Sequence, residues 1–198
     1  MVSIPSRLPL LALPALAGLI SHLAYFIRGE HHQHTHFYVF LFNAVTIGIS
    51  SLQIHLYSCP LRLAIVNTVW IMATYVIALF SSIIIYRVFL HPLRRFPGPR
   101  LLSLSKFGHA FMSRKLDNHR QMDKLHRQYG DFVRTGPNEI TIFTPEAYAA
   151  LHGPQSKCTK SDWYDVLKPN NSLHSSRVKA FHGKQKRIWD RAFSPKGV

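Results

Sequence analysis

The chain has 198 residues and a net charge of +15, and its charged residues are distributed very unevenly. Residues 1–86 contain only four charged side chains, whereas residues 87–198 hold the other 21 Lys and Arg and 8 Asp and Glu. The length suffices for one ordinary domain of about 100–200 residues, or for membrane spans plus a small domain. The charge asymmetry predicts a membrane-embedded first part and a basic, water-exposed second part.

Three apolar runs occupy the first part of the chain: Leu8–Ile27, Phe37–Leu56 and Leu63–Tyr86. About 20 apolar residues in a helix cross a hydrocarbon core of about 30 Å, so each run is long enough to be considered a span. Leu63–Tyr86 is the strongest of them, and its internal position excludes a cleaved signal peptide. The sequence therefore predicts an α-helical transmembrane anchor region over residues 1–86 with up to three spans.

The orientation of this anchor follows from the basic residues after it. Four arginines come directly after the third run: Arg87, Arg94, Arg95 and Arg100. Because flanks rich in Lys and Arg stay on the cytoplasmic side, the C-terminal part is expected in the cytosol. With three spans, Cys59 and Cys158 would lie on opposite sides of the membrane, and no intramolecular disulfide is expected.

A proline-rich hinge over residues 87–100 follows the anchor. The stretch "HPLRRFPGPR" (His91–Arg100) contains Pro92, Pro97 and Pro99. Each proline lacks an N–H and restricts the residue before it, so a continuous helix is excluded. We expect a stiff connector, since a flexible linker would be rich in Gly and Ser.

The next residues predict the order helix, hairpin, helix. Apolar residues at helical spacing indicate a helix over Leu116–Tyr129, with Gly130 at its C-terminal cap. The stretch "DFVRTGPNEITIFT" then indicates a β-hairpin with its turn at Gly-Pro-Asn. Thr144-Pro145 is typical of a helix start, and Gly153 should end that short helix.

A last helix is expected between a cap at Ser175 or Ser176 and a limit at Pro195. One apolar stripe follows it at steps of three and four residues: Val178, Phe181, Gln185, Ile188 and Ala192. At 100° per residue, His182 and Lys186 lie one turn apart beside Trp189.

A separate basic flank of this helix comprises four residues: Arg177, Lys184, Arg187 and Arg191. By pattern alone, an amphipathic helix with a solvated basic face remains the simpler interpretation.

Three stretches together carry a resemblance to a known family. They are "YRVFLHPLRRFPGPR" (Tyr86–Arg100), "QYGDFVRTGPNEITIFTPEAY" (Gln128–Tyr148) and "HGKQKRIWDRAFS" (His182–Ser194). In this order and approximate spacing, they resemble the post-anchor hinge, the first sheet hairpin and the C-helix of fungal-type, membrane-anchored cytochrome P-450 monooxygenases. The resemblance implies an incomplete α+β N-terminal part of that fold over residues 101–198, ending at the C-helix.

The resemblance also implies roles for residues of the last helix. In the family, two C-helix residues four apart contact the haem propionates, and here these positions fall on His182 and Lys186. Cationic donors pair with anionic carboxylates by charge-assisted hydrogen bonds. Lys186 stands where Arg is usual, and it supplies a point charge without a bidentate fork. The ridge Lys184, Arg187 and Arg191 resembles the surface that meets an acidic NADPH-cytochrome reductase.

The family's oxygen-activating helix, ExxR pair and glycine-rich Cys loop have no counterpart in the sequence. A haem thiolate is what favours O–O cleavage. The resemblance therefore implies a truncated monooxygenase of secondary metabolism, in the endoplasmic reticulum membrane, without stable haem or monooxygenase activity by itself. Its catalytic residues and substrate are not implied.

Three alternatives remain open. A non-catalytic, membrane-anchored protein could bind a reductase or anionic lipid through the basic helix. Nucleic acid binding is disfavoured despite the net charge, because the apolar runs are long and no groove-reading motif is present. The tract "HHQHTH" (His31–His36) could bind a metal, but a solvated loop between spans is the favoured interpretation, so no metal site is expected.

Overall fold

The computed structural model describes residues 8–29, 31–153, 155–169 and 172–194. Its contacts divide the chain into two compact units. The first unit comprises residues up to Gly29 together with His36–Thr144, and the second comprises Glu30–Thr35 and the residues from Pro145 onward. Each unit is described by itself below. The predicted division of the chain into an anchor region (1–86), a hinge (87–100) and a partial domain (101–198) rests on the sequence and stays a prediction.

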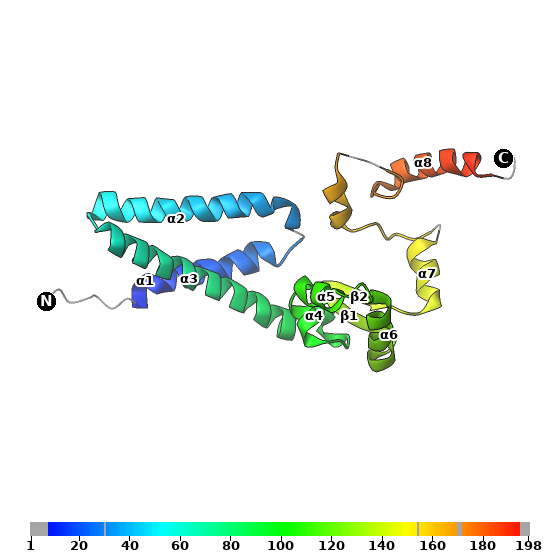
Figure 1. Cartoon of the computed structure of the whole chain (residues 1–198), viewed down its shortest axis with the longest axis horizontal. Helices are drawn as coiled ribbons and strands as arrows, with labels where there is room; N and C mark the ends of the chain where they lie inside the picture. Colours follow the sequence, from blue (N-terminus) through cyan, green and yellow to red (C-terminus); the bar gives the residue numbers. More distant parts are fainter. Residues whose placement is uncertain (1–7, 30, 154, 170–171, 195–198) are drawn as a thin grey trace. The chain divides into compact units, whose positions relative to one another are not determined.

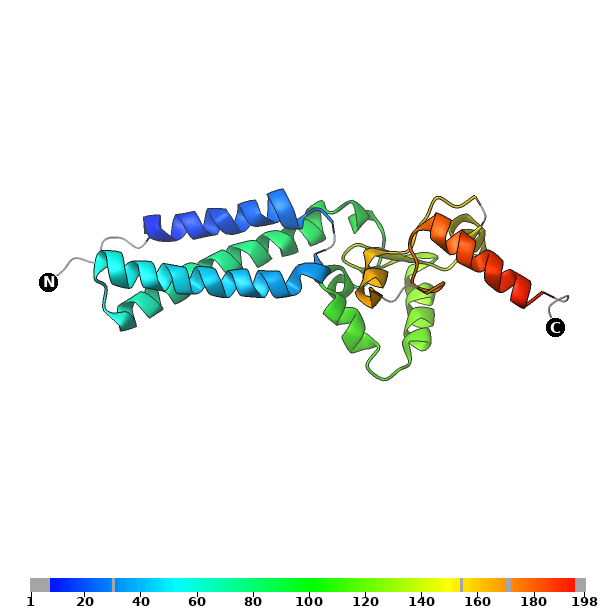
Figure 2. The same ribbon diagram turned by 90° about the horizontal axis from the view of Figure 1, so that it is seen from above.

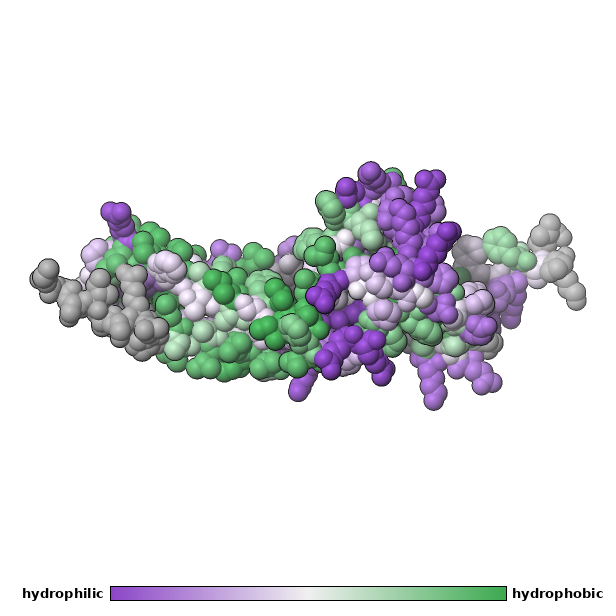
Figure 3. All heavy atoms as spheres, turned by 90° about the horizontal axis from the view of Figure 1, so that it is seen from below, coloured by the Kyte–Doolittle hydropathy of each residue, from purple (hydrophilic) through white to green (hydrophobic). Residues whose placement is uncertain are grey.

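The first unit contains three apolar helices (Figure 1). They are α1 (Leu8–Ile20), which continues in a wider turn η1 (Ser21–Phe26), α2 (Thr35–Tyr57), and α3 (Leu61–Ile85), which continues into η3 (Tyr86–Leu90). Two stretches, Thr35–Tyr57 and Leu61–Leu90, are long and apolar enough to cross a membrane, whereas Leu11–Phe26 is shorter. Apolar residues cover much of this helical part on the face shown in Figure 3. The three predicted runs are therefore helices, and two of them have the length of a span.

Helix α1 packs along α3 (Figure 2). Gly18 makes the approach possible, because a Cβ on this residue would lie 2.5 Å from the main-chain oxygen of Tyr75. Polar side chains pair across the same contact. Nδ1 of the buried His22 lies 2.7 Å from Oγ of Ser82. Small residues that let two backbones come close are typical of helix packing in membranes.

Helix α2 meets α3 through a cluster of polar side chains. Thr68 is buried, and its Oγ1 accepts hydrogen bonds from Ser50 Oγ and Gln53 Nε2, both at 3.0 Å. Asn67 Nδ2 donates to Gln53 Oε1 at 3.3 Å. These polar groups therefore satisfy one another inside otherwise apolar helices.

The proline-rich hinge forms no continuous helix, as predicted. Its backbone makes a short 3₁₀ turn η4 (Pro92–Arg95), runs extended to Pro99 and enters α4 (Arg100–Leu104). The hinge also pairs with the strand that follows later in the chain, since Arg134 N donates to Pro97 O at 2.8 Å. Contacts of α4 with η3 and with that strand hold the connector in place.

The rest of the first unit is a small α+β assembly. It contains α5 (Lys106–Met112), α6 (Asn118–Tyr129) and a hairpin of β1 (Phe132–Gly136) and β2 (Glu139–Ile142). The strands pair antiparallel, with Val133 opposite Thr141 and an irregularity between Arg134 and Gly136. Leu102, Leu125 and Val133 form the core. The hairpin prediction is confirmed.

The helix predicted over Leu116–Tyr129 begins two residues later than expected. Leu116 is 92% exposed and has a φ of +58°, so it is not part of the apolar helix face. The side chain of Asn118 explains this start, because its Oδ1 accepts from Ser113 Oγ at 2.8 Å and lies 3.0 Å from His109 Nε2. These bonds hold the loop in a tight turn. Gly130 ends the helix at a φ of +86°, as predicted.

The second unit contains η2 (His32–His34), α7 (Pro145–His152), η5 (Asp162–Leu167) and α8 (Lys179–Ala192). The predicted start of α7 at Thr144-Pro145 is confirmed. The predicted start of α8 is wrong: Val178 precedes the first turn in an extended conformation, and Ser175 and Ser176 lie in a turn outside the helix. Ser172 N donates to Ser175 Oγ at 2.9 Å, which commits that side chain to the turn. The predicted limit at Pro195 lies outside the described residues.

Candidate functional site

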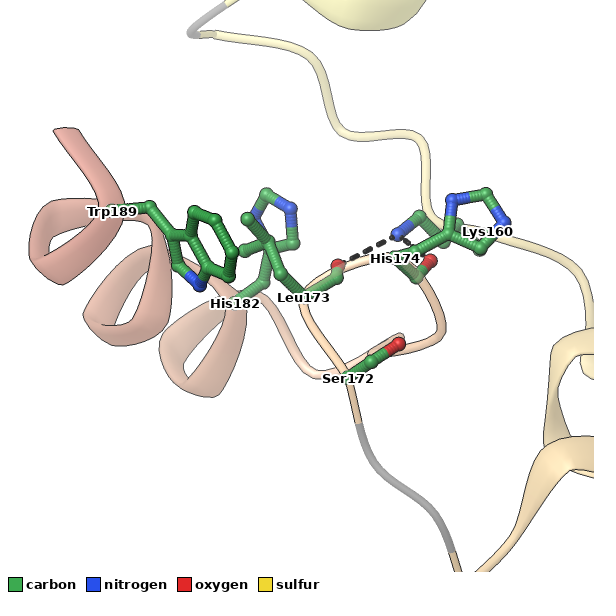
Figure 4. A pocket seen from close by; sticks show the side chains of 6 residues that line it. All are labelled: Lys160, Ser172, Leu173, His174, His182 and Trp189. Carbon is green, nitrogen blue, oxygen red and sulfur yellow. Dashed lines mark hydrogen bonds between the residues drawn. The ribbon is translucent and has the colours of Figure 1, made fainter. Parts of the chain in front are cut away.

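Helix α8 presents His182 and Trp189 to an open pocket of about 540 Å³ (Figure 4). The two residues are seven apart, so they lie on the same face two turns from each other. The opposite wall comes from the preceding irregular segment: Lys160, Ser172, Leu173 and His174. Trp189 also stacks on Phe193, with ring centroids 5.4 Å apart. The pocket thus has an aromatic side on α8 and a polar side on the segment before it.

The polar side is fixed by Lys160. Its Nζ donates to the main-chain oxygen of Leu173 at 3.3 Å and also to that of His174 (Figure 4). The same ammonium lies 5.5 Å from the ring centroid of Tyr164, which in turn packs edge-on against His174. Lys160 therefore closes a loop between residues 160 and 174 and places its positive charge on the wall of the pocket that His182 also lines.

Arg177 ties this loop to the start of α8. Its guanidinium forms ion pairs with Asp162 and Asp165, the latter at 2.5 Å, and its Nε donates to Lys160 O at 3.1 Å. Burial alone would raise the pKa of Asp165, but hydrogen bonds from Lys168 and Arg177 and their positive charges lower it overall. The backbone before α8 is thus held by ion pairs, and Arg177 does not belong to the helix flank to which the pattern assigned it.

The two residues predicted to contact haem propionates lie one turn apart on α8, and their predicted role stays a prediction. His182 is half-buried and lines the pocket, whereas Lys186 is exposed and is not part of the lining. The sequence analysis did not identify Lys160 and His174 as residues of this site. They come from an irregular segment with no periodicity, and the sequence offered no signal for their approach to α8.

The predicted basic ridge is present on α8. Lys184, Arg187 and Arg191 are all exposed, and Arg187 Nε donates only to Gly183 O one turn earlier, at 3.3 Å. Among the described residues, none of the three forms an ion pair with a carboxylate. The ridge is thus a surface of uncompensated positive charge, which suits an acidic partner.

The pocket can be compared with the propionate edge of the haem that the family resemblance implies. A cationic and aromatic pocket wall suits propionate carboxylates. Within the described ranges, no three His, Cys, Asp or Glu side chains come together as metal ligands. Cys59 lies between α2 and α3 and Cys158 is exposed, and neither lines the pocket. For the His31–His36 tract, Glu30 and the His32 side chain lie outside what the structure describes.

Neither a protein-family model nor a solved structure matches the chain. Curated proteins do, over nearly its whole length. The chain is 36% identical over 196 residues to tryprostatin B 6-hydroxylase of Aspergillus fumigatus. This match covers 95% of the chain and 34% of that enzyme.

Two further relatives carry the family name. A cytochrome P-450 monooxygenase of Aspergillus versicolor is 37% identical over 190 residues, or 94% of this chain and 34% of that protein. One of Eupenicillium brefeldianum is 45% identical over 125 residues, or 63% of this chain and 26% of that protein. The chain spans about a third of the length of the first two of these relatives. The identities over nearly the whole of this chain show that it belongs to the fungal cytochrome P-450 monooxygenases and corresponds to an N-terminal part of such an enzyme.

Proposed function

We propose that this chain is the membrane-anchoring and haem-edge part of a fungal secondary-metabolism monooxygenase, at the endoplasmic reticulum with its C-terminal part in the cytosol. The observation that carries the proposal is the match to this hydroxylase over 95% of the chain at 36% identity. A non-catalytic interaction protein has no such support, because the relatives are named as monooxygenases and a hydroxylase.

Haem is the cofactor of the parent family, and when bound by a thiolate it supplies oxygen activation. In our proposal His182 donates a hydrogen bond to one propionate carboxylate, and Trp189 shields that bond from water. Lys186, one turn from His182, contributes a positive charge from the exposed side. Lys160 adds a second positive charge at the pocket. The position of its ammonium is fixed by hydrogen bonds to two carbonyl oxygens.

By itself this chain is proposed not to retain haem or to hydroxylate a substrate. The described cysteines lie away from the pocket, and neither has a glycine-rich loop around it. The test is to produce the 198-residue chain in yeast microsomes with added haem precursor and to measure haem per chain after solubilisation. Stoichiometric haem with a thiolate-type spectrum would overturn this part of the proposal.

Membrane anchoring and orientation have a separate test on the same microsomes. The chain should stay in the membrane pellet after alkaline carbonate extraction, since apolar helices of this length are held by the hydrocarbon core. A protease added outside sealed microsomes should remove the residues after the hinge. Release into the carbonate supernatant, or protection of α8, would contradict the anchor or its orientation, respectively.

The ridge Lys184, Arg187 and Arg191 is proposed to contact the reductase. Salt-sensitive co-purification with the reductase should be lost in the variant Lys184→Glu/Arg187→Glu/Arg191→Glu, because charge reversal turns attraction into repulsion. A matched control reverses three exposed basic residues of α6: Arg120, Lys124 and Arg127. Equal loss in both variants would show a general charge effect and would contradict a specific contact.

A further inference from the structure

Arg134 carries a buried positive charge without a carboxylate partner. The residue is only 4% exposed, and its terminal nitrogens donate to main-chain oxygens of Arg87 and Pro137. Its third nitrogen, Nε, is buried and has no hydrogen-bond partner among the described residues. Since nearly all buried polar groups in folded proteins are hydrogen-bonded, this unused donor indicates that a further acceptor belongs beside Arg134.

The guanidinium of Arg87 adds a second positive charge. Arg87 is half-buried in η3, and its Nη1 also donates to a main-chain oxygen, that of Leu104. Burial first, and then the charge of Arg87, lower the pKa of Arg134, so the two guanidinium groups are close enough to repel each other. A guanidinium does not lose its proton in a protein, and both charges therefore persist in the folded state.

The acidic side chains of the first unit are engaged elsewhere. This unit has four of them, and each binds a group other than the two arginines: Asp117 accepts from Gln121, Asp123 pairs with Arg127, Asp131 with His126 and Glu139 with Lys106. Within the described ranges, neither Arg87 nor Arg134 forms an ion pair. Because buried charges in proteins are normally compensated, the two arginines require an anion from outside this unit.

Two polar side chains complete the site and connect it to the surface. His91, in the hinge, lies within range of the charges of both arginines and forms a hydrogen bond with Asn138. Asn138 belongs to the hairpin turn and is exposed. We call Arg87, His91, Arg134 and Asn138 the junction cluster. It consists mainly of N–H donors, and guanidinium groups bind the oxygens of phosphate and carboxylate by charge-assisted hydrogen bonds.

We propose that the junction cluster binds one phosphate group, either as inorganic phosphate or a soluble phosphate monoester, or on the headgroup of a lipid. Its oxygens accept from Nε of Arg134 and from the remaining N–H groups of Arg87. A phosphate monoester carries a charge of about −1.5 to −2 at neutral pH, which compensates both guanidinium groups. A water molecule could accept from Nε but would leave both charges uncompensated. The site involves neither the pocket on α8 nor the basic ridge, and it goes beyond the function proposed above.

The test measures binding of radiolabelled inorganic phosphate to the full chain in maltoside detergent by equilibrium dialysis. Sodium chloride keeps the ionic strength constant and screens the exposed lysines and arginines. We expect saturable binding of one phosphate per chain. Arg134→Met should weaken this binding about ten-fold or more. The control Arg120→Met removes an exposed guanidinium of α6 and should leave it unchanged.

A second variant keeps both arginines, because Arg134→Met also removes hydrogen bonds of the fold. Asn138→Asp has nearly the same shape and supplies a carboxylate beside His91. It should raise the unfolding midpoint in phosphate-free buffer and weaken phosphate binding several-fold, since its charge competes with the phosphate. Gln128→Glu, exposed on α6, makes the same change of charge and should do neither.

Competition distinguishes the two sources of the phosphate group. If glycerol 3-phosphate displaces the label as well as short-chain phosphatidic acid does, the site takes a soluble phosphate. If the lipid is effective at far lower concentrations, the site takes a lipid headgroup, and both results support the proposal. Absence of saturable binding overturns it, even if Asn138→Asp stabilises the chain. Equal weakening of binding in the variants and their controls overturns it as well.

Discussion

Arg134 Nη1 donates a hydrogen bond to the main-chain oxygen of Arg87 at 3.0 Å, which joins β1 to the last turn of the third apolar helix. Its Nη2 donates to Pro137 O at 2.8 Å within the hairpin turn. Arg134 is only 4% exposed, and burial, then the nearby charge of Arg87, lowers its pKa. Arg87 reaches in the other direction, to Leu104 O. Two arginines thus cross-connect the third apolar helix, the hairpin and α4 through carbonyl oxygens.

Arg134→Met should loosen this junction. The substitution leaves the carbonyl oxygens of Arg87 and Pro137 without their donor, and an unsatisfied buried polar group costs about 1–3 kcal/mol. We expect a lower unfolding midpoint in detergent and faster hydrogen exchange at the hinge amides. The control Arg127→Met removes an exposed ion pair with Asp123 and should change stability by less than about 1 kcal/mol. Equal effects of the two substitutions would contradict a special role for Arg134.

The hinge should weaken as the pH falls, through His91. Nδ1 of His91 accepts from Leu93 N at 3.1 Å and caps the turn Pro92–Arg95. Burial, and next the charge of Arg134, lower the pKa of His91 below the ordinary 6.5. A hydrogen bond with Asn138 raises this pKa, and the charge of Arg87 lowers it further. The folded state therefore binds a proton at His91 less readily than the unfolded state does. Neutral His91 contributes its full stabilisation above pH 6.5, and this contribution is lost as the pH falls through the pKa of His91 in the folded state.

The measurement is the pH dependence of hydrogen exchange at residues 91–99. Exchange should accelerate below pH 6.5 in the original chain, because protonated Nδ1 can no longer accept the Leu93 hydrogen bond. His91→Asn keeps a side-chain acceptor at the cap without a titrating group, so its exchange, corrected for the intrinsic rate, should not change over the same interval. A retained pH response in this variant would assign the effect to another residue.

Two glycine substitutions in the apolar helices should have opposite outcomes. Gly18→Ala places a Cβ 2.5 Å from Tyr75 O, so α1 must move away from α3, and overpacking of this kind costs about 1–3 kcal/mol. Gly48→Ala, in α2, meets no atom within 4 Å and should be neutral or slightly stabilising because Ala favours helix. Unfolding in detergent followed by circular dichroism compares them. Equal stability of the two variants would mean that α1 does not pack closely on α3.

The ion pairs of Arg177 should hold the second unit's irregular segment. Arg177→Gln removes the pairs with Asp162 and Asp165, and we expect several-fold faster cleavage by a protease between residues 157 and 168. Because hydrogen bonds hold the pKa of Asp165 below its ordinary 3.8, the same segment should loosen as the pH falls through that lowered value. Arg191→Gln, on the exposed ridge, is the control and should leave the cleavage rate unchanged.

Local chemistry made several elements predictable. The hairpin follows from Gly136-Pro137-Asn138 between two alternating strands, and α7 follows from Thr144-Pro145 and Gly153, because these residues determine backbone conformation by themselves. The short helix α5 was missed although its cap is visible in the sequence. Ser105 Oγ accepts from Phe107 N at 3.2 Å, which is the ordinary bond of an N-terminal cap.

Contacts between distant residues were not predictable. The alternation in β1 puts Val133 and Arg134 on opposite faces, and one face should therefore be exposed. Both are buried, because the hinge covers the second face: a Cβ on Gly98 would lie 2.5 Å from Arg134 O. The start of α8 was wrong for a similar reason, since the ion pairs of Arg177 hold the backbone outside the helix. In the candidate site, His182 and Trp189 follow from helix periodicity, but Lys160 comes to line the same pocket only through the fold.

The polar cluster between α2 and α3 has a consequence for how the protein enters the membrane. Ser50 and Gln53 also donate to carbonyl oxygens of their own helix, but Asn67 and Thr68 find their side-chain partners, among the described residues, only across the pair of helices. Alone, each helix would expose polar side chains to hydrocarbon at a cost of a few kcal/mol. In the anchored state proposed here, we therefore expect α2 and α3 to enter the membrane as a pair.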